Sequence, residues 1–204
     1  MKRIGVLISG RGSNLQALID AGRAGTLGGG QIAVVISNVE SAYGLERARA
    51  AGIPALHIDH RGKQRTAFDA EVVQALKAHG VELVCLAGFM RLLSAVFVRA
   101  FPGRILNIHP ALLPAFPGLD AQRQALEHGV KVTGPTVHIV DEGLDSGPIV
   151  AQEAVAVKDD DSVETLSARI LEAEHRIYPL AVRVLLSGRA RVEGRKVILE
   201  GPLP

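Results

Sequence analysis

Short apolar runs in the first half of the chain alternate with segments of helical periodicity. The runs at 4–8, 32–36, 55–58 and 83–87 are mainly apolar, as strands are when both faces of a parallel sheet are covered. Apolar residues recur three or four positions apart after 15, over 43–51 and over 65–79, which predicts helices. This alternation predicts an α/β fold, with a Rossmann-like, mostly parallel sheet that has helices on both faces.

The second half of the chain follows a different pattern. A strand at 104–110 and a short helix at 121–127 are followed by extended segments at 130–133 and 136–140, which we interpret as two strands or one bent strand. Another strand is expected over 149–157, and no helix-length crossover separates these segments, which favours a mixed or antiparallel arrangement.

A long helix is expected next, and Pro179 should kink it without ending it because the apolar phase continues to Val184. Asp161 and Glu164 have the spacing of a capping box at its start. The segment 189–199 predicts a hairpin.

A Gly-rich turn, residues 9–14, joins the first predicted strand to the first helix. This arrangement directs backbone N–H groups at an anion, and its candidate phosphate ligands are Gly12, Ser13 and Asn14. Leu15 replaces the third glycine of a dinucleotide motif, so a single phosphate fits better than a dinucleotide. An ordinary tight turn is the alternative.

Three polar residues suggest acyl-transfer chemistry. Asn107 and His109 are two apart on a predicted strand, so they share a face. Asp145 lies in an acidic, Gly-rich loop after the next long apolar run. An amide and an imidazole can stabilise a developing oxyanion, and a carboxylate can orient the imidazole. The alternative, three residues with local structural roles, fits the spacing equally well.

Composition excludes several functional classes. The net charge is +2 with no basic block, and 3% of residues are aromatic, which argues against a nucleic-acid surface. Cys85 is the single cysteine, so no internal disulfide can form, which favours a reducing cytoplasm. The His and Cys spacing predicts no metal site, and no apolar run is long enough for a signal peptide or a membrane span.

Two motifs resemble a known group of enzymes. The segment 107–114, Asn-Ile-His-Pro-Ala-Leu-Leu-Pro, is similar to the Asn-x-His-Pro-[Ser/Ala]-Leu-Leu-Pro signature of the formyltetrahydrofolate-dependent formyltransferase superfamily. The segment 145–148, Asp-Ser-Gly-Pro, resembles the acidic loop of the same superfamily. Together with residues 9–14, these motifs resemble phosphoribosylglycinamide formyltransferases, over about residues 3–184.

The resemblance implies transfer of a formyl group from 10-formyltetrahydrofolate to the amine of 5'-phosphoribosylglycinamide, giving formylglycinamide ribotide in de novo purine biosynthesis. The amine would attack directly, and Asn107 with protonated His109 would stabilise the tetrahedral intermediate, assisted by Asp145. The ribotide would contact Glu174 as well as the phosphate loop. The folate-binding residues implied by the resemblance are Arg65, Met90, Arg91, Leu92, Leu93, Asn107, Val140, Asp141 and Asp145.

We therefore expect one formyltransferase domain, residues 1–204. Residues 1–103 would form a phosphate-binding half, and 104–204 a catalytic and folate-binding half. The expected partners are small molecules, with no metal, nucleic acid or membrane, in a monomer or homodimer.

Three alternative functions remain. A formyltetrahydrofolate deformylase has an additional N-terminal domain, for which we expect no room before residue 3. A methionyl-tRNA formyltransferase has a C-terminal domain and a basic surface. A non-enzymatic phosphate-binding module would leave Asn107, His109 and Asp145 unexplained.

Overall fold

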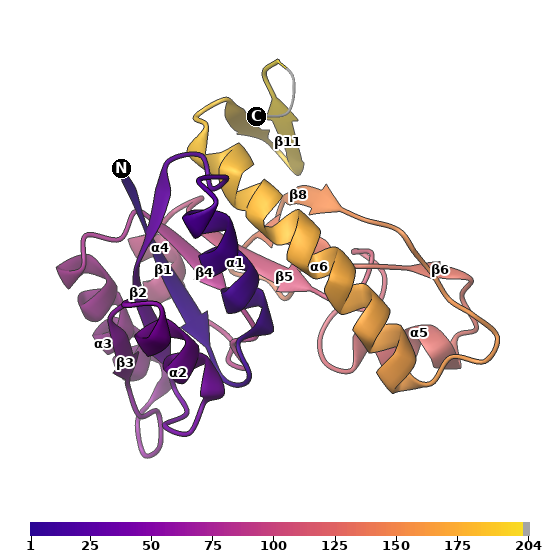
Figure 1. Cartoon of the computed structure of the whole chain (residues 1–204), viewed down its shortest axis with the longest axis horizontal. Helices are drawn as coiled ribbons and strands as arrows, with labels where there is room; N and C mark the ends of the chain where they lie inside the picture. Colours follow the sequence, from indigo (N-terminus) through magenta and orange to yellow (C-terminus); the bar gives the residue numbers. More distant parts are fainter. Residues whose placement is uncertain (202–204) are drawn as a thin grey trace.

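The computed structural model describes residues 1–201, and within them nine strands form one sheet in the order β10-β11-β8-β7-β5-β4-β1-β2-β3 (Figure 1). The first five strands pair in parallel, whereas β7 is antiparallel to both β5 and β8. The strands are β1 Lys2–Ile8, β2 Gly30–Ser37, β3 Ala55–His57, β4 Leu83–Leu86, β5 Ile105–His109, β7 Thr136–Ile139, β8 Ile149–Gln152, β10 Ala190–Glu193 and β11 Lys196–Leu199. A parallel half continued by a mixed half, in which β11 pairs with β8 in parallel, confirms the expected fold class.

Helices cover both faces of the sheet. Apolar residues of α1, α2 and α6 form one core with alternate residues of β1, β4 and β5, and α3 and α4 form a second core on the opposite face. Figure 1 shows α1 and α6 side by side, with α6 continuing beyond the parallel half towards α5. The helices are α1 Ser13–Arg23, α2 Tyr43–Ala50, α3 Arg65–Ala78, α4 Ala95–Ala100, α5 Ala121–Glu127 and α6 Val163–Leu186.

The extended segments expected at 130–133 and 136–140 are two separate strands, β6 and β7, and the single strand expected over 149–157 is divided into β8 and β9. β6 (Val132–Thr133) and β9 (Val155–Ala156) leave the main sheet and pair with each other. The crossing point is Gly134, where an added Cβ would lie 1.9 Å from the Glu153 carbonyl oxygen. Both segments leave the main sheet at this close approach, so the expectation of one strand over 149–157 is wrong.

The start of α6 differs from the expected capping box. Ser162, not Asp161, is the N-cap, and its hydroxyl accepts from the Thr165 N–H while the Thr165 hydroxyl accepts from the Ser162 N–H. Asp161 instead binds the Arg169 guanidinium at 2.8 Å, so its carboxylate is not available for capping. Pro179 lies inside α6, which is a single helix as predicted, and β10 and β11 form the expected hairpin.

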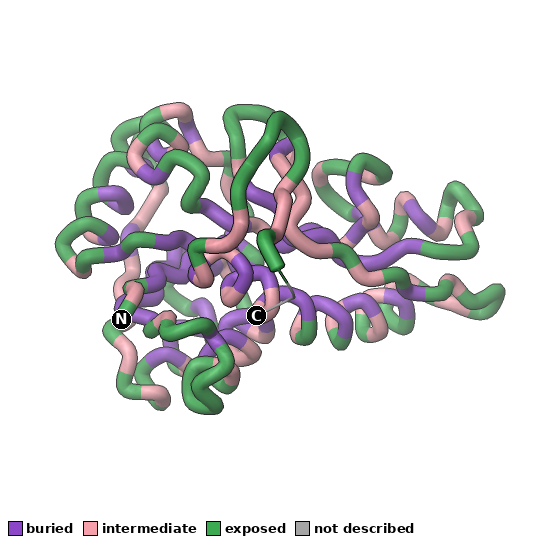
Figure 2. The backbone as a smooth tube through the Cα atoms, turned by 90° about the horizontal axis from the view of Figure 1, so that it is seen from above, coloured by how far each residue is buried: buried purple, intermediate pink, exposed green. Residues whose placement is uncertain are grey.

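Burial follows these layers. Figure 2 shows buried residues along the interior strands and helix faces, and exposed residues in the connecting loops. The search of residues 1–201 for a helix long and apolar enough to cross a bilayer found none.

Candidate active site

Strands β5 and β7 place four polar side chains on one face of the sheet. Leu106 and Ile108 point into the core beneath α6, so Asn107 and His109 point to the opposite face, as predicted. In the antiparallel register, Asn107 pairs with His138 and His109 pairs with Thr136. Because β7 alternates in the same way as β5, His138 and Thr136 share the face of Asn107 and His109.

Asp145 approaches this cluster from the loop between β7 and β8. Its Oδ2 lies 3.5 Å from His109 Nδ1, and its Oδ1 lies 3.6 Å from His138 Nε2. The Gly118 N–H donates to Oδ2 at 2.8 Å. Asp145 has φ 47°, a left-handed conformation in which a non-glycine residue is uncommon. The loop therefore holds one carboxylate between two imidazoles, as the sequence predicted for His109 alone.

Each imidazole has one nitrogen near a backbone carbonyl and the other facing Asp145. His109 Nε2 lies 2.8 Å from the Phe116 carbonyl, and His138 Nδ1 lies 3.1 Å from the Ile139 carbonyl. A carbonyl only accepts, so Nε2 carries the proton of the neutral His109 ring. The nitrogens facing Asp145 are His109 Nδ1 and His138 Nε2, and His138 Nε2 is also 3.2 Å from the Asn107 amide nitrogen. A proton on either of these two nitrogens would lie against the carboxylate.

In the ligand-free protein, burial opposes the protonated state that the resemblance implies for His109 during the reaction. Burial lowers the pKa of His109 below its ordinary value, and the hydrogen bond to Phe116 and the charge of Asp145 oppose this without reversing it. Burial raises the pKa of Asp145, but His138 and the Gly118 N–H lower it further than burial raises it. At neutral pH the resting state is thus a neutral His109 beside an ionised Asp145.

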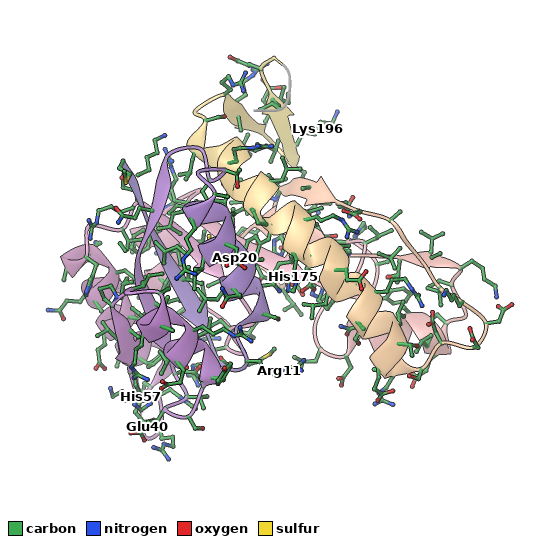
Figure 3. The ribbon with its side chains drawn as sticks, viewed as in Figure 1. Arg11, Asp20, Glu40, His57, His175 and Lys196 are labelled. Carbon is green, nitrogen blue, oxygen red and sulfur yellow. The ribbon has the colours of Figure 1, made fainter. Side chains whose placement is uncertain are left out.

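The Gly-rich turn before α1 packs against the start of α2. Gly12 has φ 70° and an added Cβ there would lie 2.7 Å from the Gly44 Cα, so both features require glycine. Ser13 is the first residue of α1 and is half-buried, with its backbone at the helix N-terminus as predicted. Figure 3 marks Arg11 in this loop, between β1 and α1.

Asn14 joins this loop to α6. Its amide donates to Glu174 Oε2 at 2.6 Å, and both side chains are buried. Burial raises the pKa of Glu174 to about 7, and the Asn14 amide lowers it less. Two of the residues assigned to the ribotide are thereby brought together, although they are 160 positions apart.

The segment 88–94, expected to bind folate, lies beside the Gly-rich turn. The Arg91 guanidinium stacks 4.9 Å above the Phe68 ring, and Arg65 is exposed at the start of α3, three positions before Phe68. Met90 and Leu92 are exposed large apolar side chains, at 71% and 61%. Leu93 and Val140 are half-buried, and Asp141 is exposed, where its carboxylate accepts from the Gly143 N–H and the Ser146 hydroxyl. These contacts do not join Arg65, Leu92 or Asp141 to the imidazole cluster.

Two surface cavities lie away from the cluster. A groove of about 520 Å³ runs between α1 and α6 from Ser13 to His175, and Figure 3 labels His175 on α6 and Asp20 on α1. A second cavity of about 410 Å³ lies near the ends of β2 and β3, beside Glu40 and His57. Among residues 1–201, the search for groups of three or more His, Cys, Asp or Glu able to hold a metal found none.

His138 is the member of the cluster that the sequence did not indicate. It falls in an apolar run and has no motif of its own. Its alternation with Thr136 puts it on a definite face, but only the register of β7 against β5 places it opposite Asn107. Thr136 has a different role, because its hydroxyl donates to the Ala111 carbonyl and accepts from the Leu113 N–H, which fixes the loop after β5.

Comparisons with known proteins identify the family of this chain. Residues 2–182 match the family described as formyl transferase. The chain is 46% identical to phosphoribosylglycinamide formyltransferase of Escherichia coli (strain K12), over 96% of this chain and 92% of that protein. The crystal structure of glycinamide ribonucleotide transformylase 1 from Symbiobacterium toebii superposes with a TM-score of 0.96 at 60% identity, covering 98% of this chain and 94% of that one.

A longer protein contains a similar segment. The trifunctional purine biosynthetic protein adenosine-3 of Drosophila melanogaster is 53% identical over 94% of this chain, which spans only 14% of that protein's length. The family model and the relatives of matching length both cover the Gly-rich turn, β5 and the loop with Asp145. The chain belongs to the formyl transferase family.

Proposed function

We propose that this chain transfers the formyl group of 10-formyltetrahydrofolate to the amine of 5'-phosphoribosylglycinamide, in de novo purine biosynthesis. The observation that carries the proposal is the cluster in which Asp145 lies between His109 and His138 beside Asn107, at the ends of adjacent strands. Family membership and relatives named for this reaction support it. The buried thiol of Cys85 is consistent with action in the cytoplasm.

Asn107 and His109 would stabilise the oxygen that becomes negative when the amine attacks the formyl carbon. The Asn107 amide donates to His138 Nε2 in the ligand-free protein, and His109 Nε2–H donates to the Phe116 carbonyl. Each donor would exchange that partner for the oxyanion. A donor aimed at developing charge stabilises the transition state more than the ground state, which is what accelerates the step.

Asp145 would carry the proton between the two substrates. Attack by the neutral amine forms a C–N bond and leaves a positively charged nitrogen. The ionised carboxylate of Asp145 can accept that nitrogen's proton through a water, while His109, whose Nδ1 lies 3.5 Å from Asp145 Oδ2, directs its Nε2–H at the oxyanion. The proton is then returned to N10 of the folate as the C–N10 bond breaks, and no covalent enzyme intermediate is required.

The substrates would meet at the ends of β1, β4 and β5. We place the ribotide phosphate on Gly12, Ser13 and the backbone of Asn14, and its glycinamide side near Glu174, which Asn14 holds in place. We place the folate against 88–93 and 140–145, with its glutamate towards Arg91 and Arg65. Exposed Met90 and Leu92 support an apolar contact there. Both halves, 1–103 and 104–204, therefore contribute to each substrate.

The test is conversion of 10-formyltetrahydrofolate, followed with and without phosphoribosylglycinamide. We expect conversion that depends on the ribotide, with one formylglycinamide ribotide formed for each folate consumed. Equal conversion without the ribotide, releasing formate, would instead establish the chain as a deformylase. An Asn107→Ala variant serves as the matched control, because it removes a proposed catalytic donor from a half-buried strand position without touching the phosphate loop.

A further inference from the structure

Ser9 connects the two loops assigned to the two substrates. It is the residue after β1, at the start of the Gly-rich turn. Its backbone N–H donates to the Gly88 carbonyl at 3.1 Å, and its hydroxyl accepts from the Met90 N–H at 2.9 Å. The phosphate loop and the segment 88–94 are thus joined by two hydrogen bonds from one residue.

Asn38 fixes the direction of the second hydrogen bond. The Ser9 hydroxyl donates to Asn38 Oδ1 at 2.6 Å, and Asn38 is buried and contacts His60 through both its side chain and its carbonyl. Because the hydroxyl proton is committed to Asn38, the oxygen lone pairs remain for the Met90 N–H. Hydrogen bonds linked in this way strengthen one another, so Ser9 is held more firmly than a free hydroxyl would be.

Both ends of this connection are attached to rigid elements. The Gly10 carbonyl accepts from the Gly44 N–H, and the Arg11 carbonyl accepts from Arg47 Nε at 2.9 Å, so α2 supports the phosphate loop. At the far end of 88–94, the Ser94 N–H donates to the buried carboxylate of Asp69 at 2.6 Å. The segment 88–94 is therefore anchored once by Ser9, next to the phosphate loop, and once by Asp69, away from it.

We propose that Ser9 is a positioning residue through which ribotide binding strengthens folate binding. The inference rests on the proposed function. A phosphate at Gly12 and Ser13 adds contacts to the loop that begins at Ser9, and so stabilises further the hydrogen bonds that Ser9 already makes. The Met90 amide and the segment 88–94 then leave this arrangement less often, and have less conformational freedom left to lose when the folate binds. The reverse effect, of folate on ribotide, must be of equal size.

The expected coupling is the contribution of about one hydrogen bond. A net 0.5–1.5 kcal/mol for such a bond corresponds to roughly a two- to tenfold tighter folate dissociation constant when the ribotide is saturating. Ser9→Ala removes the acceptor of the Met90 N–H and the donor to Asn38, and leaves the backbone bond to Gly88 in place. The ratio of folate dissociation constants without and with ribotide should then fall close to one.

The experiment is calorimetric titration with tetrahydrofolate, which carries no formyl group and therefore cannot react, with and without saturating phosphoribosylglycinamide. The matched control is Asp69→Asn, which weakens the other anchor of 88–94 and keeps an acceptor for the Ser94 N–H. We expect Asp69→Asn to weaken tetrahydrofolate equally in both titrations and to keep the parent ratio, whereas Ser9→Ala loses the ratio.

Three results would overturn the proposal. They are a parent ratio of one, an unchanged ratio in Ser9→Ala, and an equal loss of the ratio in Asp69→Asn, which would indicate general loosening of the segment. Failure of the proposed function would be seen separately, as absence of ribotide-dependent turnover by the parent with 10-formyltetrahydrofolate.

Discussion

Glu174 gives a prediction about stability that does not depend on any substrate. The residue is 7% exposed, and its carboxylate accepts a hydrogen bond from the Asn14 amide at 2.6 Å. Burial raises its pKa from 4.5 to about 7. Glu174→Gln keeps an oxygen that can accept from Asn14 and removes the group that must ionise. The variant should be more stable than the parent at alkaline pH.

The sign follows from proton linkage. Below the unfolded pKa of 4.5 the carboxyl group is protonated in both the folded and the unfolded state, and its ionisation then has no effect on the free energy of unfolding. As pH rises towards 7, the unfolded chain loses the proton while the folded chain keeps it, so the parent becomes less stable. Above about pH 7 the carboxyl group is ionised in both states, and the loss of stability no longer increases with pH. Each unit of pKa difference costs about 1.4 kcal/mol, so the parent should lose about 2.5 kcal/mol relative to the variant between about pH 5 and about pH 8.

The assay is urea unfolding followed by circular dichroism, because the chain has no tryptophan for fluorescence. The difference in free energy of unfolding between Glu174→Gln and the parent should grow across that range, and the difference in melting temperature should grow by about 5–10 °C. The control is Glu172→Gln, on the exposed side of the same helix, for which we expect no such growth. A difference for Glu174→Gln that is constant with pH would refute the reasoning.

Three further predictions concern the site. Asn107→Ala should reduce kcat by about 10²–10³ with both KM values nearly unchanged, because it removes an oxyanion donor; losses confined to KM would contradict this role. Asp145→Asn should move the imidazole titration of His109 to lower pH in NMR spectra, because it removes a charge that raises the pKa of His109; an upward shift would contradict the geometry. Gly12→Ala should lower the melting temperature and raise the ribotide KM, because an added Cβ meets the backbone of α2 at a positive φ. Gly10→Ala is its control, since an added Cβ at Gly10 meets nothing within 4 Å; equal effects would refute the steric argument.

Periodicity alone predicted which side chains share a face. Asn107 and His109 are two apart in an apolar run, and residues two apart on a strand point to the same face of the sheet. The Gly-rich turn was also readable locally, because strand, glycine and helix start follow one another without interruption. Both predictions depend on neighbours in sequence.

The remaining features depend on tertiary structure. His138 joins the cluster through the register of β7, which its own sequence does not specify. The neutral state of His109 follows from burial, whereas sequence gave only the neighbouring charge of Asp145. The run 149–157 contains no glycine or proline, so its division into β8 and β9 follows from the close approach at Gly134, on another segment.

The strand order has a consequence for the chain during synthesis. Within residues 1–201, strands β1 to β4 pair only with one another and with β5, so the parallel part of the sheet can assemble while the rest is still on the ribosome. Later strands add outward along one edge, first β7, then β8, and then the hairpin of β10 and β11. The apolar face that includes Val6, Ile8 and Leu106 is completed only by α6, the last helix of residues 1–201. Nascent chains stopped before Val163 should therefore expose this face, and they are the stage at which chaperone binding or aggregation is to be expected.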